Sequence, residues 1–211
     1  EQFAAYEQRL GSKIRAKIGM TEDGIFNAVQ GCWYVDTGCL GDAVQGQVGV
    51  GLGEAQLVMA KCKNWDLDSK VVVTNKAAAG IVRGYGGQEL NSCLARNMAH
   101  CMMQADKDPV ECFKKNYVAP GDKYYWRDGL IWQSRGSSHY PETMQMAADK
   151  FGWKDCWKGW LKPTRIEGRK AYGVGCGVIG NADVAEDNTQ CIVRIQHDVK
   201  GRYATLIVQT D

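Results

Sequence analysis

TNKAAAGIVRGYGGQEL, residues 74–90, joins a strand pattern to a helix pattern through a glycine-rich loop. An apolar run at 71–73 precedes the stretch, and residues with helical spacing follow from Leu90. The loop carries one arginine, Arg83, and one aromatic residue, Tyr85, among glycines. Such a junction can leave main-chain amides open to a large ligand, and an arginine there offers planar donors to an oxyanion. A tight turn with a surface arginine is the alternative interpretation.

The segments that follow the loop have helical spacing. A helix with one buried stripe is predicted over 88–105. The apolar residues of that stripe are Leu90, Leu94, Met98, Cys101 and Met102. Asp108 before Pro109 is typical of a helix start, so a second helix is predicted in PVECFKKNYV. PETMQMAADKFG predicts a third helix, which Gly152 would end.

Strand patterns lie on both sides of these helices. SKIRAKIGM (12–20) and IFNAVQGCWYVDT (25–37), joined by the turn TEDG, predict a β-hairpin. KVVVTN (70–75) predicts a buried strand, and the tail predicts strands in KAYGVGCGVI, TQCIVRIQHD and RYATLIVQT. The glycine-rich stretch 38–54 is expected to be an irregular connection before a short helix in EAQLVMAKC. Turn-forming residues in APGDKYYWRDG (119–129) suggest a junction between subdomains.

The composition argues against several classes of function. With 26 basic and 24 acidic residues the net charge is +2, which favours neither nucleic acid nor an anionic membrane as a partner. No apolar run reaches the roughly 18 residues of a membrane span, and the N-terminus lacks the pattern of a signal peptide. A cytoplasmic protein is therefore expected. The nine cysteines include no C-x-x-C pair and the three histidines are far apart, so we expect reduced, packed thiols and no metal site.

The sequence GCGVIG, residues 175–180, matches the G-x-G-x-x-G pattern of dinucleotide-binding loops. Such a loop needs a helix directly after it, because the helix N-terminus binds the pyrophosphate. The acidic stretch NADVAEDN and then a strand pattern follow instead. A glycine-rich strand close to a neighbouring main chain is therefore the favoured interpretation.

Several motifs in order resemble the molybdenum hydroxylases, the family of xanthine dehydrogenases and aldehyde oxidases. VVVTNKAAAGIVRGYGGQE resembles that family's R-G-F-G-G-P-Q loop after a TN strand. The hairpin that runs into DTGCLGD resembles its D-T-G-A-Y-x-D segment, and DKDPVECFKKNYVAPGD resembles its D-P-x-E-x-R-x-K-N segment. GRKAYGVGCGV is similar to the stretch that opens a second cofactor domain. The resemblance implies an α+β fold, with antiparallel and mixed sheets packed against helices.

The resemblance also implies roles for individual residues. Arg83 and Gly84 would contact a molybdenum–molybdopterin cofactor, Tyr85 would pack on the substrate ring, and Glu89 would support the loop. The proline that follows the glycine pair in the family's R-G-F-G-G-P-Q loop is missing here, since Gln88 directly follows Gly87. GVGLGEAQ carries no arginine where purine-oxidising members have one, which argues against purine oxidation.

On this resemblance the chain is an internal portion of a large subunit. Residues 1–118 would be the latter part of a first molybdopterin-binding domain, and 119–211 the beginning of a second. No catalytic residue is expected within the chain, because the family's catalytic glutamate would lie beyond Asp211. FAD and [2Fe-2S] clusters would be on other domains or subunits, and a homodimer is a further expected state.

The complete enzyme would hydroxylate an aldehyde or an N-heterocycle with water as the oxygen source, and the chain alone would be inactive. Two alternatives stay open. One is a non-catalytic binding or scaffold module with the same fold, and the other is a dinucleotide-binding oxidoreductase.

Overall fold

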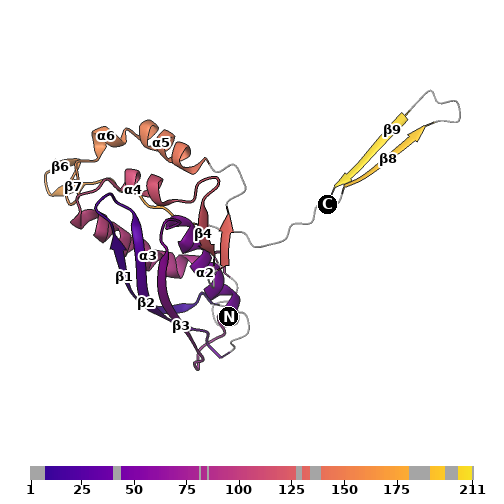
Figure 1. Cartoon of the computed structure of the whole chain (residues 1–211), viewed down its shortest axis with the longest axis horizontal. Coiled ribbons are helices and arrows are strands. Elements are labelled where there is room, and N and C mark those ends of the chain that lie inside the picture. The colour runs from indigo at the N-terminus through magenta and orange to yellow at the C-terminus, as the bar shows by residue number, and fades with distance from the viewer. Residues whose placement is uncertain are drawn as a thin grey trace.

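A computed structural model describes residues 8–39, 44–80, 82–84, 86–126, 130–133, 139–180, 191–197 and 204–210. It is an α+β protein of small antiparallel and mixed sheets packed with helices, as the sequence predicts (Figure 1). Among the described residues, no helix has both the length and the apolar character needed to cross a bilayer.

A three-stranded sheet in the order β1-β2-β3 forms the centre of the N-terminal part. β1 (Gly11–Met20) and β2 (Phe26–Asp36) pair antiparallel, which confirms the predicted hairpin. β3 (Asn64–Val72) pairs parallel to β2, so the sheet is mixed. The core lies between this sheet and the helices, with Phe26 and Trp33 of β2 fully buried.

Helix α2 (Val44–Val58) lies in the crossover from β2 to β3, where the sequence predicted an irregular connection. That prediction is wrong, and the packing explains why. A Cβ atom on Gly51 would lie 2.6 Å from the main-chain oxygen of Gly86, and one on Gly53 would lie 2.8 Å from the Trp126 ring. Each glycine costs the helix about 1 kcal/mol relative to alanine, but close packing against two neighbours offsets that cost.

Helix α3 (Gly87–Gln104) follows the glycine-rich loop and packs against β1 and α2. The predicted helix and its buried stripe are confirmed. Leu90, Leu94, Met98 and Met102 are at most 1% exposed, whereas Cys101 is only partly buried. Helix α4 (Pro109–Asn116) begins as predicted, with the Asp108 side chain accepting a hydrogen bond from the amide of Val110.

The segment predicted to be a turn-rich junction contains regular structure. β4 (Lys123–Trp126) pairs antiparallel with β5 (Leu130–Gln133), and β4 packs against α2. The turn-forming residues 119–122 do make a turn, in which Asp122 accepts a hydrogen bond from the amide of Ala119; those at 128–129 lie outside the described residues. The strand that follows is short and aromatic, and its Trp126 ring fills the space that Gly53 leaves open.

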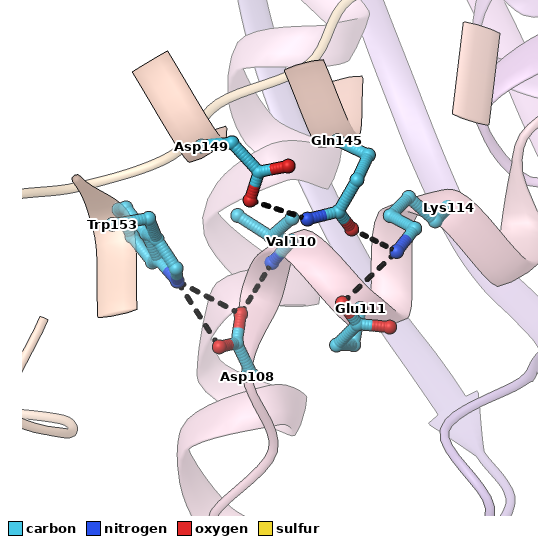
Figure 2. Close-up of polar contacts among 7 residues, drawn as sticks. All are labelled: Asp108, Val110, Glu111, Lys114, Gln145, Asp149 and Trp153. Carbon is cyan, nitrogen blue, oxygen red and sulfur yellow. Dashed lines mark hydrogen bonds and ion pairs between the residues drawn. The ribbon is translucent and has the colours of Figure 1, made fainter. Parts of the chain in front are cut away.

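Helix α5 (Tyr140–Phe151) is the predicted third helix, and Gly152 ends it with a positive φ of 73°. Helix α6 (Trp153–Cys156) follows directly. Figure 2 shows how both helices contact α4: the Trp153 indole donates to Asp108 at 3.0 Å, and Lys114 donates to Glu111 and Gln145. Asp108 therefore caps α4 and holds α6 with the same carboxylate.

The C-terminal part contains two short hairpins. β6 (Arg165–Glu167) pairs with β7 (Lys170–Tyr172), and β8 (Cys191–His197) pairs with β9 (Ala204–Thr210) as the sequence predicts. The predicted strand in KAYGVGCGVI is wrong beyond Tyr172, because residues 173–180 pair with none of the strands that the structure describes. Cys176 and Val178 of that segment pack against the core, so side-chain burial holds it in place without strand pairing.

The strand predicted at 70–75 is confirmed at 70–72, but the prediction that it is buried is wrong. β3 ends at Val72, and Val71, Val72 and Val73 are 39%, 41% and 65% exposed. A continuous apolar run is buried only where both faces of a strand are covered. β3 is an edge strand of its sheet, and its last residues lack such cover.

Candidate functional site

Two segments far apart in the sequence hydrogen-bond to each other and position the glycine-rich loop. The amide of Thr37 donates to Val72 at 3.0 Å, and the amide of Ala79 donates to Thr37 at 2.9 Å. The amide of Thr74 donates to the main-chain oxygen of Gly38, and the amide of Cys39 donates to the main-chain oxygen of Lys76. The end of β2 and the segment after β3 therefore form one rigid base directly before the loop.

Asp36 fastens this base from the end of β2. Its carboxylate accepts hydrogen bonds from Lys76 at 2.5 Å, from Thr74 at 2.6 Å and from the amide of Gly38 at 3.0 Å. These donors, with the Lys76 ammonium first, lower the pKa of Asp36 from 3.8 to about 2. Gly38 has a φ of 67°, and a Cβ atom there would lie 2.0 Å from the oxygen of Ala77, so only glycine fits.

The loop itself is described at 82–84 and from Gly86 onward; Tyr85 lies outside the described residues. The amide of Gly87 donates to the oxygen of Gly84 at 2.7 Å and closes a tight turn. Gly84 and Gly86 have φ angles of 101° and 90°, which favour glycine. The Arg83 side chain is exposed to solvent.

Helix α2 fills the inner side of this bend. A Cβ atom on Gly86 would lie 2.0 Å from the main-chain oxygen of Gln47, and the Gln47 side chain donates to the oxygen of Gly80 at 2.9 Å. A Cβ atom on Gly87 would overlap the Glu54 carboxylate at 1.3 Å. The sequence interpretation took these glycines to keep amides open for a ligand. The structure instead shows Gly86 and Gly87 buried by close contact with α2.

Glu54 is a residue of this site that the sequence interpretation missed. It is 2% exposed, on a helix that the sequence did not predict, and its carboxylate lies beneath the first residue of α3. The available signal was an acidic residue directly after the glycines of VGVGLGEAQ. Burial raises the pKa of Tyr117, and the nearby Glu54 carboxylate raises it further.

Glu89 lies in the first turn of α3 and pairs with Arg9. Arg9 donates to Glu89 Oε1 at 3.0 Å and, through its other nitrogen, to the main-chain oxygen of Arg83 at 2.7 Å. The Glu89 side chain is 6% exposed. Its second oxygen, Oε2, is buried and has no hydrogen-bond partner among the described residues. Glu89 and Arg83 are thus connected through Arg9, and Glu89 keeps one acceptor for a donor group.

A cleft of about 580 Å³ lies beside this group. Its lining combines two arginines with one carboxylate, two hydroxyls, an amide and a thiol: Arg9, Arg96, Glu89, Ser12, Ser92, Gln88 and Cys93, together with Ile14. Guanidinium groups suit phosphate or other oxyanions, and a buried carboxylate oxygen suits an N–H or O–H donor. A ligand that carries both an anionic group and ring N–H groups therefore matches the cleft.

The GCGVIG motif and the buried cysteines have structural roles in the part of the chain that the structure describes. Gly180 of GCGVIG lies against α2, and a Cβ atom there would lie 2.1 Å from the main-chain oxygen of Glu54. The acidic stretch after it falls outside the described residues. Cys62 and Cys112 are buried, and burial raises the pKa of Cys62 to about 11, so the thiol stays protonated.

The family model for the molybdopterin cofactor-binding domain matches residues 1–117. That range includes the hairpin, the glycine-rich loop, α3 and α4. No curated protein sequence matches the chain.

Solved structures share the fold at low sequence identity. The aldehyde oxidoreductase from Desulfovibrio gigas is 22% identical with a TM-score of 0.58, over 71% of this chain and 16% of its own. Quinoline 2-oxidoreductase from Pseudomonas putida 86 is 20% identical with a TM-score of 0.60, over 72% of this chain and 19% of its own. CO dehydrogenase from Oligotropha carboxidovorans is 20% identical with a TM-score of 0.54, over 68% of this chain and 18% of its own. The chain thus spans less than a fifth of each of these proteins.

Proposed function

The chain belongs to the molybdopterin cofactor-binding domain family, and from this premise we propose that it forms part of a molybdenum hydroxylase-type oxidoreductase. The complete enzyme hydroxylates an aldehyde or an N-heterocycle with water as the oxygen source. The observation that carries the proposal is that the family match covers the whole loop region, where Arg83 is exposed and Glu89 Oε2 has no hydrogen-bond partner among the described residues.

The residues of the cleft fit a molybdopterin group. A pterin has ring N–H groups that could donate to Glu89 Oε2, and its phosphate suits a guanidinium. Arg83 and Gly84 would hold the cofactor at the loop, Glu89 would support the loop through Arg9, and Tyr85 would orient the substrate ring. When bound, the molybdenum centre supplies the two-electron redox chemistry.

The residues of this chain bind and orient, and none of them is proposed as the catalytic acid or base. Arg83 stabilises negative charge at the cofactor with a charge-assisted hydrogen bond worth about 1.5–3 kcal/mol. The base that joins the end of β2 to residues 74–79 holds the main chain directly before the loop, so less conformational entropy is lost when a ligand orders the loop. The catalytic glutamate of the enzyme would lie outside this chain, and the chain alone would be inactive.

The proposal includes the rest of the assembly. Residues 1–118 and 119–211 would belong to successive molybdopterin-binding domains in a cytoplasmic enzyme. The rest of the large subunit and the iron–sulfur and FAD domains or subunits would be its partners, and it could form a homodimer.

The substitution Arg83→Ala in the complete enzyme tests the proposal. We expect the variant to retain less molybdenum, or to turn over at least tenfold more slowly, because the cofactor loses a charge-assisted contact. Molybdenum content by mass spectrometry and kcat with an aldehyde substrate measure the two effects. Arg15→Ala, which removes an exposed arginine from β1, is the matched control. Normal molybdenum content together with normal kcat in Arg83→Ala would refute the role of Arg83 and favour a scaffold module.

A further inference from the structure

A second pocket lies far along the chain from the glycine-rich loop. It has a volume of about 380 Å³ and lies between α3, the start of α4, and the segment from α6 to residue 176. Aromatic and small apolar residues form most of its lining, among them Trp157, Trp160, Pro163, Ala171 and Tyr172. In Figure 1, β6, β7 and α6 lie together at one end of the molecule.

The aromatic rings of the pocket are fixed in place. Trp157 and Trp160 meet edge to face with ring centroids 6.4 Å apart, and the Trp160 indole donates to the oxygen of Lys107 at 2.7 Å. The Arg165 guanidinium lies 4.2 Å from the centre of the Tyr172 ring. A rigid aromatic pocket can receive an apolar side chain with little ordering cost, which is the property of interface hot spots.

The surface around the pocket is apolar and basic at once. Leu161 is 89% exposed and has a φ of 58°, a backbone conformation that L-residues with side chains rarely adopt, and Ile166 is 68% exposed. Between residues 153 and 172 there are two acidic residues and six basic ones. The basic residues, all exposed, are Lys154, Lys158, Lys162, Arg165, Arg169 and Lys170. Six basic and two acidic residues give this short segment a net charge of +4, whereas the net charge of the whole chain is only +2.

We propose that this surface docks an acidic segment of a partner protein, which inserts one large apolar side chain into the pocket beside Trp157 and Trp160. The positive charge complements an acidic segment and repels a cationic ligand, so the aromatic rings are not a cage for an ammonium group. The exposed Leu161 and Ile166 supply apolar contacts beside the pocket, which a sugar–phosphate backbone would not use. The pocket, of about 380 Å³, is large enough to receive a leucine or phenylalanine side chain. This docking surface is independent of the cofactor proposal.

The test uses the intact protein that carries this chain and a fluorescein-labelled peptide, EDELFDED, in a fluorescence anisotropy titration. We expect saturable binding that weakens severalfold when the salt concentration rises from 50 to 500 mM. The peptide EDEGSDED lacks the apolar residues and KRKLFKRK reverses the charge, and both should bind at least tenfold more weakly.

Two sets of variants locate the binding surface. Lys158→Glu with Lys162→Glu should weaken EDELFDED binding at least tenfold, whereas Lys13→Glu with Lys17→Glu, the same charge change on β1, should leave it unchanged. Trp157→Ala should also weaken it at least tenfold, with circular dichroism checking that the variant is folded. The proposal is overturned if EDELFDED binds no better than the control peptides or equally well to both lysine double variants. It is also overturned if a single-stranded oligonucleotide binds there more tightly than the peptide, or if the surface instead joins two copies of the protein in sedimentation velocity.

Discussion

Asn116 is fully buried at the end of α4 and hydrogen-bonds to the turn of the β1–β2 hairpin. Its amide nitrogen donates to the oxygens of Gly24 and Cys112, both at 2.8 Å, and its amide oxygen accepts from the amide of Phe26 at 2.8 Å. Within the motif DKDPVECFKKN, the last residue therefore has a structural role. It fastens α4 to a hairpin about 90 residues earlier in the chain.

Asn116→Ala should lower the free energy of unfolding by about 2–4 kcal/mol, because it leaves the amide of Phe26 and the oxygen of Gly24 buried without partners. Urea unfolding followed by circular dichroism measures the change. Asn97→Ala is the control, since that side chain is only partly buried and donates within α3. Equal, small effects of the two substitutions would contradict the role of Asn116.

Asp36 makes the stability of the loop base depend on pH. Its folded pKa of about 2 lies below its ordinary value of 3.8, so the ionised form stabilises the fold. That stabilisation is present above about pH 4 and is lost as the pH falls through about 2. The urea midpoint of Asp36→Asn should therefore be below that of the wild type at pH 6, and the difference should shrink toward pH 2. Asp68→Asn, which removes an exposed acid paired with Lys70 at 3.4 Å, is the control and should lower the urea midpoint at pH 6 less than Asp36→Asn does.

At the scale of elements, the sequence predicted those helices and strands that a local pattern of residues determines. The β1–β2 hairpin has alternating residues and a turn that ends in Gly24, and α3 has a continuous apolar stripe. Helix α2 could not be predicted in this way, because its glycines oppose a helix on propensity alone. These glycines allow α2 to pack closely against the glycine-rich loop and Trp126, which are both distant in sequence. Glu54 and its place under the loop were therefore missed together with the helix that carries it.

The contact between α2 and the loop gives a prediction at this scale. Gly87→Ala would place a Cβ atom 1.3 Å from Glu54, so either α3 or the carboxylate must move. We expect a loss of about 1–3 kcal/mol in the free energy of unfolding, as for other overpacked sites, and weaker cofactor retention in the complete enzyme. Thermal unfolding measures the first effect, and molybdenum content the second. Gly175→Ala is the control, because nothing lies within 4 Å of that Cβ position. If both variants unfold at the wild-type temperature, α2 and the loop are not tightly packed.

At the scale of the whole molecule, the order of strands in a sheet is decided by contacts that no local pattern reports. Alternating and apolar runs predicted β1, β2 and part of β3, but not that β3 pairs parallel to β2 at the edge of the sheet. The same limitation applies to the candidate site. Motifs named Arg83 and Glu89, whereas Arg9, which joins them by hydrogen bonds, lies in a segment without any motif. Only the folded chain brings the three together.

The edge of the sheet leads to a prediction about association. Val71 and Val73 are 39% and 65% exposed at the end of an edge strand, and such strands pair readily with other chains. The purified chain 1–211 should therefore self-associate as its concentration rises, and Val71→Lys with Val73→Lys should suppress this, because lysines on an edge strand oppose pairing. Sedimentation velocity measures the shift in sedimentation coefficient with concentration. Met146→Lys with Phe151→Lys removes two exposed apolar residues from α5, which are 58% and 56% exposed, and should have little effect. If the α5 pair suppresses association as strongly as the β3 pair, the contact depends on general hydrophobic exposure and not on the strand edge.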